Sequence, residues 1–279
     1  MKRLLLSILP RCGLFLCLAA GVLGRAASGP DSDDLPPVPK LDLPFPVGEK
    51  LTYVIYWGWI GVGTSEATTD WVWRDGAWSL QIKFRTQSNG VVDKLYPVDD
   101  RVEVYIDPDT LRPDVFILDL NEGKTVRHAV TEFDWDTMRA TYTRKREGRE
   151  DEVKLVELEK GTRDLVSFMY FLRRYDFTEG NFYEYKVLAD EKLYDLTVKT
   201  SGYERIKLEN YGRIKSLKMD PEAQFEGVFV RKGKMRVWLS DDDRQLLTKL
   251  MLDTPFANVR LLLRSVEGPG ADDWVKESK

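Results

Sequence analysis

The sequence predicts a mainly β protein, a single domain built from one large curved antiparallel sheet, open or closed like a barrel, with one amphipathic helix near residues 162–175. Two observations lead to this fold class. Short segments that alternate apolar and polar residues recur along the chain between turn residues, as is typical of strands with one buried face. One segment replaces this two-residue period with a helical period.

The first 26 residues have the pattern of a secretory signal peptide. Lys2 and Arg3 form a positive start, residues 4–23 are largely apolar, and the small residues Gly24 and Ala26 occupy positions −3 and −1 of a cleavage site. We therefore expect a mature chain that begins near Ala27 and is periplasmic or extracellular.

Two other interpretations of this segment stay open. An uncleaved membrane anchor would need a longer apolar run, because Pro10 and Arg11 interrupt the segment. Lipid attachment at Cys17 would normally follow a small residue, whereas Leu16 is large. Cys12 and Cys17 are the two cysteines of the sequence. A processed chain would thus have no disulfide, and we expect it to have no transmembrane span.

The charge balance makes nucleic acid an unlikely class of partner. Four of the 42 basic residues lie in the first 26 residues, which leaves 38 against 46 acidic residues, a net charge of −8. The densest basic run, residues 144–146, is followed at once by acidic residues. A basic surface that follows a phosphate backbone is therefore not expected.

Composition divides the remaining chain into three parts. Residues 27–48 contain six prolines among polar residues, which predicts an extended leader, because proline lacks a backbone donor and disfavours helix. Residues 49–267 carry the alternating pattern and form the antiparallel β domain. Residues 268–279 are polar apart from Trp274 and are expected to be a flexible tail.

The clearest strand pair is a hairpin over residues 64–87. Asp75-Gly76 suits a type I′ turn, which sets the register so that the numbers of paired residues sum to 151. This register places apolar and polar residues on opposite faces, and a shift of one residue would mix them. The apolar face pairs Trp73 with Trp78, Trp71 with Leu80, Thr69 with Ile82, and Ala67 with Phe84.

The same alternation continues beyond this hairpin and predicts more than ten strands. Residues 235–239 and 257–263 each place their alternate apolar side chains on one face. Tight turns are expected at residues 107–110, 121–123, 134–136, 147–148 and 190–192. Gly58, Gly61 and Gly63 are expected to let the chain bend sharply before Thr64.

The helical segment is predicted to begin at Thr162 as its cap. Leu165, Phe168, Met169 and Leu172 follow at the spacing of one helix face. This apolar stripe must pack on something, and the curved sheet is the one large partner available. The helix is therefore expected to cover the concave face of the sheet.

Residues that could carry chemistry are few. His128 is the single histidine, and with no cysteine in a processed chain a zinc site is not expected. We interpret His128 as structural or exposed. Residues 99–100 and 241–243 are acidic clusters without the glycine and spacing of a calcium loop, and we expect both to be turns. Neither a catalytic residue nor a cofactor is predicted.

Aromatic residues are the more unusual feature. Eight tryptophans occur in the chain, and aromatic platforms can line a lipid cavity, although cross-strand packing explains many of them. Combined with the helix stripe, they give a candidate ligand-binding set of Trp71, Trp73, Trp78, Phe84, Phe168, Met169 and Leu172.

Five ordered segments resemble a known family. Residues 45–53 and 57–64 are similar to the opening of the exported bacterial domain of unknown function 3108, residues 93–101 and 106–113 to its second block, and residues 237–242 to its third. The resemblance covers about residues 45 to 265. It implies export and a β-rich fold, and it supplies no catalytic residues.

Three functions are consistent with these observations. The first is a non-enzymatic envelope protein whose curved sheet shelters a lipid or other apolar ligand, or the apolar part of an envelope protein partner. The second is an envelope hydrolase that acts on glycans through carboxylates, for which paired carboxylates should face each other in a pocket. The third is a purely structural or protein-binding module, for which the core should be solid.

Overall fold

A computed structural model describes residues 35–90, 92–225, 228–229, 234–253 and 258–274. Its strands all belong to one sixteen-stranded sheet. In chain order they are β1 (Lys50–Trp57), β2 (Ile60–Arg74), β3 (Ala77–Ser88), β4 (Asp99–Ile106), β5 (Pro113–Glu122), β6 (Thr125–Asp134), β7 (Arg139–Arg144), β8 (Glu152–Glu157), β9 (Arg163–Asp164), β10 (Phe182–Ala189), β11 (Lys192–Leu208), β12 (Gly212–Phe225), β13 (Val228–Phe229), β14 (Lys234–Ser240), β15 (Leu247–Asp253) and β16 (Asn258–Glu267). The helices are α2 (Leu165–Leu172) and the short 3₁₀ helix η3 (Ala271–Trp274).

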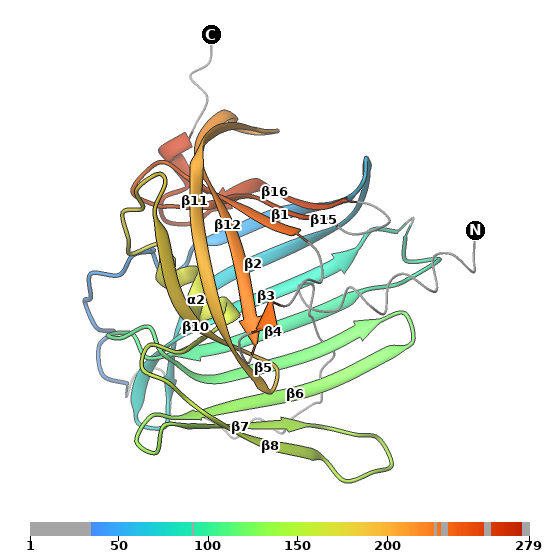
Figure 1. Cartoon of the computed structure of the whole chain (residues 1–279), viewed down its shortest axis with the longest axis vertical. Coiled ribbons are helices and arrows are strands. Elements are labelled where there is room, and N and C mark those ends of the chain that lie inside the picture. The colour runs from blue at the N-terminus through green and yellow to red at the C-terminus, as the bar shows by residue number, and fades with distance from the viewer. Residues whose placement is uncertain (1–34, 91, 226–227, 230–233, 254–257, 275–279) are drawn as a thin grey trace.

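The sheet curves around α2 (Figure 1). Its strand order is β8-β7-β6-β5-β4-β3-β2-β1-β16-β15-β14-β12-β11-β10-β9, with β13 paired to β12. Neighbours are antiparallel except β9 and β10, which are parallel. Within the described residues no ladder joins β8 to β9, so the sheet is barrel-like but not closed. The predicted fold class, a large curved antiparallel sheet with one helix, is confirmed.

The β2–β3 hairpin has the predicted register. Arg74 pairs with Ala77 and Trp73 with Trp78, and the ladder continues in the same register to Gly63 and Ser88. Asp75 and Gly76 have φ values of 53° and 84°, as a type I′ turn requires.

The predicted turns at residues 107–110, 121–123, 134–136, 147–148 and 190–192 all lie at or beside strand ends. The prediction of a turn at residues 99–100 is wrong, because both residues belong to β4 and pair with β3. Two successive aspartates favour turns in general, but here pairing with β3 holds both residues in an extended conformation.

The predicted bend over residues 58–63 is present as the turn between β1 and β2. Gly58 has a φ of 58°, and the β1–β2 ladder shifts register between Ile55 and Tyr56. A Cβ at Gly63 would overlap the carbonyl oxygen of Gln87 in β3, so this position requires glycine.

Helix α2 begins later than predicted, and it is not amphipathic. Asp164, not Thr162, is the N-cap, and its carboxylate accepts hydrogen bonds from the backbone N–H groups of Val166 and Ser167. None of the eight residues of α2 is exposed. Residues 166, 170 and 171, on the far side of the predicted stripe, are also apolar and pack in the protein interior, so the helix has no polar, solvent-exposed face.

Two hydrophobic clusters meet at α2. The larger one contains Phe168 and Leu172 with side chains of β1, β2, β10–β12 and β14–β16. The second contains Tyr170 with side chains of β3–β7 and with Phe45, which precedes β1. The helix therefore holds together the two halves of the curved sheet.

Part of the predicted leader, residues 27–48, packs on the body of the protein. From residue 35 onward it is described, and Phe45 is 3% exposed, with its ring 4.8 Å from that of Tyr170. The carbonyl oxygen of Pro36 accepts a hydrogen bond from Trp78 Nε1. The tail that we expected to be flexible is also attached at Trp274, whose Nε1 donates to Asp242 at 2.7 Å.

The predicted signal peptide, residues 1–26, lies outside the described residues, as do Cys12, Cys17 and Ala257. Within the described part of the chain, no helix is long and apolar enough to cross a membrane.

Candidate functional site

A cavity of about 310 Å³ lies between α2 and the inner face of the sheet. Its walls come from β1–β6, from β10–β12, from β14–β16 and from the helix. Most of the side chains that line it are aliphatic or aromatic. The curved sheet and α2 thus surround an apolar space, partly open to solvent, beside the packed core clusters.

Four of the seven predicted ligand-binding residues line this cavity. Phe84 projects from β3, and Phe168, Met169 and Leu172 form the helix wall. The hairpin register and the helix spacing together account for this convergence, because both sets face the inside of the sheet.

The three predicted tryptophans do not line the cavity. Trp73 and Trp78 pack edge to face with ring centroids 5.4 Å apart, and Trp71 packs on the second hydrophobic cluster. Leu43, Phe45 and Val47 of the proline-rich segment before β1 belong to the same cluster as Trp71. The tryptophans therefore contribute to packing in this region, and none of the three lines the cavity.

Sequence reasoning missed a large part of the lining. Met235, Val237 and Leu239 of β14 face the cavity, as do Val259 and Leu261 of β16. The sequence predicted that the residues of each group share a face, which is confirmed for these five residues, but it did not predict that the two faces line a cavity. The signal that could have identified them is the absence of aromatic residues at these inward positions, which leaves space open opposite the helix.

The cavity has few polar side chains, and its hydroxyls at Thr86 and Ser65 and both of its carboxylates have hydrogen-bond or ion-pair partners. Thr86 Oγ1 donates to Ser65 Oγ at 2.6 Å, joining β3 to β2. Asp164 is 2% exposed and accepts hydrogen bonds from α2, including one from Ser167 Oγ. Asp190 forms an ion pair with Arg127. Both carboxylates at the cavity thus have structural partners.

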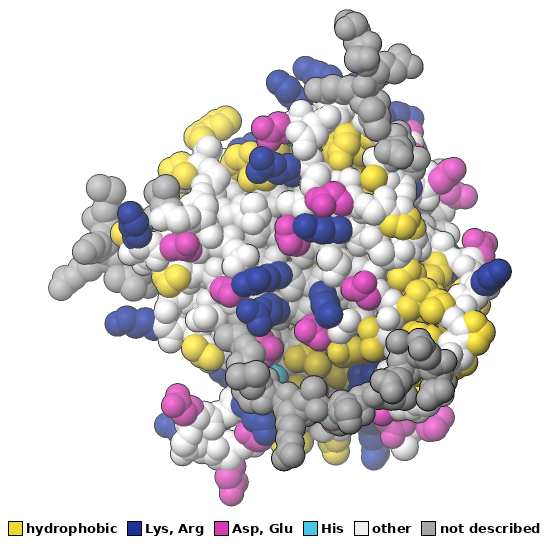
Figure 2. Space-filling view, turned by 180° about the vertical axis from the view of Figure 1, so that it is seen from behind, with side chains coloured by type: hydrophobic (Ala, Val, Ile, Leu, Met, Phe, Trp, Pro, Cys, Tyr) yellow, Lys and Arg dark blue, Asp and Glu magenta, His cyan; other side chains and the backbone are white. Residues whose placement is uncertain are grey.

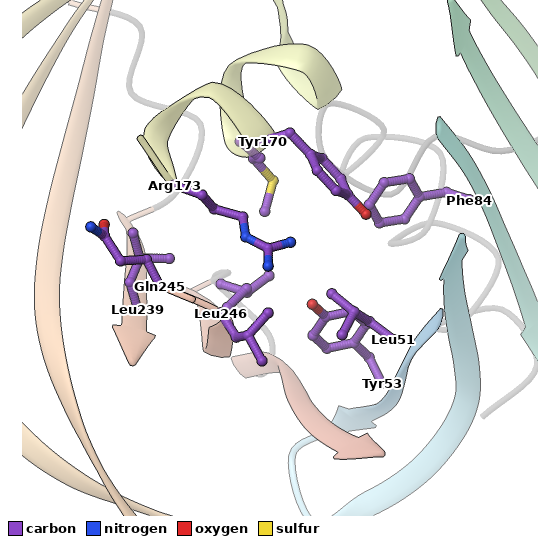
Figure 3. A pocket seen from close by; sticks show the side chains of 10 residues that line it. Leu51, Tyr53, Phe84, Tyr170, Arg173, Leu239, Gln245 and Leu246 are labelled. Carbon is purple, nitrogen blue, oxygen red and sulfur yellow. The ribbon is translucent and has the colours of Figure 1, made fainter. Parts of the chain in front are cut away.

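A second, small pocket of about 30 Å³ lies at the C-terminal end of α2. Figure 3 shows Arg173 extending from the helix end toward Tyr53 and Leu246. The guanidinium forms a two-point ion pair with the carboxylate of Glu49, with distances of 2.6 Å and 3.0 Å, and its Nε donates to the carbonyl oxygen of Arg244. Such a volume holds about one or two water molecules and no organic ligand. We call these contacts of Arg173 with Glu49 and Arg244 the anchor of α2, and the small pocket lies beside them.

Burial shifts the proton affinities of groups around these cavities. It raises the pKa of Tyr53 and of Tyr170 well above the ordinary value for tyrosine. It also raises the pKa of Asp100, on β4, to about 8. Asp100 is fully buried; its Oδ1 accepts a hydrogen bond from the Asn121 N–H, and Oδ2 has no hydrogen-bond partner. Asp100 does not line the large cavity, so this unusual carboxyl is a feature of the wall.

His128 lies on β6 and contacts Asp119 of β5 on the face opposite the cavity. No group of three or more histidine, cysteine, aspartate or glutamate side chains in the described ranges could hold a metal ion. Basic and acidic side chains are interspersed over the face of the molecule in Figure 2.

Comparisons with known proteins agree with this fold. A family model described as "Protein of unknown function (DUF3108)" matches residues 52–264. No curated protein matches the sequence. A similar solved structure is the "Beta-barrel-like Protein of Domain of Unknown Function DUF1849 from Brucella abortus", with a TM-score of 0.53, 10% identity, and coverage of 79% of this chain and 97% of that chain. At this identity the likeness concerns the fold alone.

Proposed function

The chain belongs to the DUF3108 family of proteins of unknown function, and we propose that it is an exported, non-enzymatic protein of the cell envelope that shelters an apolar ligand between α2 and the sheet. The observation that carries the proposal is the apolar cavity of about 310 Å³. An apolar cavity of about 150 Å³ is enough for benzene, and pockets for drug-sized ligands begin at about 300 Å³. A lipid acyl chain or a compact apolar molecule fits this description.

The polar groups at the cavity favour binding over catalysis. A glycan hydrolase needs two carboxylates that are free to exchange protons or attack the sugar. Here Asp164 caps α2 and Asp190 is paired with Arg127, so each carboxylate already has a structural role. The third function considered from the sequence, a purely structural module, is disfavoured because the core contains this cavity.

Export is the part of the proposal that depends on residues 1–26. A periplasmic or extracellular location follows if cleavage occurs after Ala26. N-terminal sequencing of the protein isolated from cells should find Ala27 at or near the start. A retained Met1, or a lipid on Cys17, would contradict this location.

Ligand binding can be tested by filling the cavity. Ala223 of β12 lines it, so Ala223→Trp should occupy the space where the ligand sits. The matched control is Ala77→Trp, the same substitution at an exposed position of the hairpin turn. Native mass spectrometry of protein purified from its own envelope should detect a retained apolar molecule in the wild type and the control.

The same three proteins should be titrated with phenylnaphthylamine, a neutral apolar fluorophore. We expect wild type and Ala77→Trp to bind it, and Ala223→Trp to bind at least ten-fold more weakly while remaining folded by circular dichroism. Failure of the wild type to bind the fluorophore or retain any ligand would refute the proposed function.

A further inference from the structure

One boundary of the curved sheet is closed by side chains instead of backbone hydrogen bonds. Ladders connect every neighbour in the order from β8 through β1 to β9, but within the described residues none connects the two ends of this order. The β10–β11 turn lies against β6, β7 and β8 across this boundary, which we call the seam.

Two ion pairs hold the turn in place. Asp190 pairs with Arg127 of β6, whose Nη2 also donates to the hydroxyl of Tyr142 in β7 at 2.8 Å. Glu191 pairs with Lys154 of β8, with an Nζ–Oε1 distance of 3.3 Å. The first pair is mostly buried, since the Arg127 side chain is 13% exposed, whereas the second is more accessible at 44% for Lys154.

A small apolar cluster completes the seam. Leu188 of β10 and Leu193 of β11 pack with Phe133, Ala140 and Val156 of β6, β7 and β8. These contacts are between side chains that come from distant parts of the chain. Separating them leaves no backbone N–H or C=O group unpaired, in contrast to the opening of a ladder.

The seam borders the cavity directly. Ala189, Asp190 and Tyr194 line the cavity on one side of it, and Thr131 and Phe133 line it on the other. Movement of the turn away from β6 would therefore widen access to the apolar space on this side while the ladders stay intact.

We infer that the seam is the portal through which the apolar ligand enters and leaves, with the β10–β11 turn as its moving part. This inference rests on the proposed function, because it concerns the ligand of the same cavity. When the turn moves, water can solvate Asp190, Arg127, Glu191 and Lys154, which offsets part of the loss of the two ion pairs.

Bridging the seam tests the inference. In the double variant Lys154→Cys/Glu191→Cys, a short bismaleimide can link β8 to the turn, and the processed chain has no other cysteine. The matched control is Thr68→Cys/Lys83→Cys, which bridges two residues that already pair in the β2–β3 ladder. Uptake and release of phenylnaphthylamine are followed by stopped-flow fluorescence, with each variant measured before and after bridging.

We expect bridging across the seam to slow both uptake and release at least ten-fold, and bridging of the control pair to leave both rates unchanged. Unchanged rates after bridging the seam would overturn the portal while the proposed function stands. A wild-type protein that does not bind the fluorophore would refute the proposed function and the portal with it.

A second variant loosens the seam instead of closing it. Asp190→Asn keeps the shape of the side chain but removes its pairing charge, and it should raise uptake and release rates at least three-fold with little change in affinity. Asp99→Asn removes a surface partner of Arg85 away from the seam and should leave the rates unchanged. Equal rates for wild type and Asp190→Asn would count against the portal.

Discussion

The β2–β3 hairpin and the seam are two parts of the same curved wall, yet they are held together by different means. The hairpin joins strands that are consecutive in sequence through a two-residue turn and an uninterrupted ladder. The seam joins residues 63 and 37 positions apart, in the pairs Arg127–Asp190 and Lys154–Glu191. Local sequence therefore specifies the strands of the sheet, whereas its closure depends on long-range side-chain contacts.

The anchor of α2 is a second long-range device, and it gives the largest effect that we predict. Glu49 is 1% and Arg173 7% exposed, and they are 124 positions apart. Glu49→Gln would leave the guanidinium buried without its counter-charge, which should lower the free energy of unfolding by about 3–5 kcal/mol. Urea denaturation measures this loss.

The matched double variant Glu49→Leu/Arg173→Met should recover most of the stability, because it removes both charges together. A loss below about 1 kcal/mol for Glu49→Gln would show that long-range anchoring matters less than the contrast with the hairpin suggests.

The hairpin turn gives the next effect and tests the local side of the comparison. Gly76 has a φ of 84°, and a Cβ there would meet no atom within 4 Å. Gly76→Val should therefore destabilise through backbone strain alone, by about 1–3 kcal/mol. Ala77→Val, at the next residue, is the control without a positive φ. Equal urea midpoints for Gly76→Val and wild type would refute the importance of the turn geometry.

Asp100 combines local and long-range effects. It pairs with the preceding strand, β3, but its burial depends on the assembled sheet. Burial raises its pKa to about 8. A raised pKa means that the folded protein binds this proton more tightly than the unfolded chain does. The resulting stability is complete below about pH 4, the ordinary range for aspartate, and is lost as the pH rises through about 8.

Asp100→Asn removes this titration. It should raise the free energy of unfolding at pH 8 by at least about 1 kcal/mol and change it little at pH 4, because Asn is neutral at both values. Urea denaturation at the two pH values measures the difference. An equal effect at both would mean that Asp100 ionises normally in the folded protein.

The sequence specified the parts of this fold whose causes lie within a few residues. Asp75-Gly76 fixed a register that the structure reproduces, and the alternation at Met235, Val237 and Leu239 placed these residues on an inward face. Four cavity residues, Phe84 among them, were predicted because they belong to such regular patterns.

The errors arose where a distant segment changed the surroundings of a residue. The tryptophans near the hairpin turn were candidates for ligand binding, but they lie away from the cavity, where the proline-rich segment contacts Trp71 and Trp78. Asp164 replaces Thr162 as the cap because β9 pairs with β10 and keeps residues 163–164 extended. Glu49, Arg173 and Arg127 carried no sequence signal, since the partner of each charge is fixed by the assembled fold.

His128 provides the smallest expected effect and the sharpest test of which face of the wall is functional. Its alternation with Thr131, which lines the cavity, places the imidazole on the outer face of β6, where it contacts Asp119. A partly exposed pair of this kind contributes about 0–1 kcal/mol. We therefore expect His128→Ala to shift the free energy of unfolding by less than about 0.5 kcal/mol.

The same variant should bind phenylnaphthylamine like the wild type, because removing an outward side chain leaves the cavity walls unchanged. Fluorescence titration and urea denaturation, carried out on His128→Ala beside Asp119→Ala, check both expectations. If a folded His128→Ala protein lost ligand binding, the outer face of β5 and β6 would take part in function. Ligand binding would then depend on the outer face of β5 and β6 as well as on the inner face that lines the cavity.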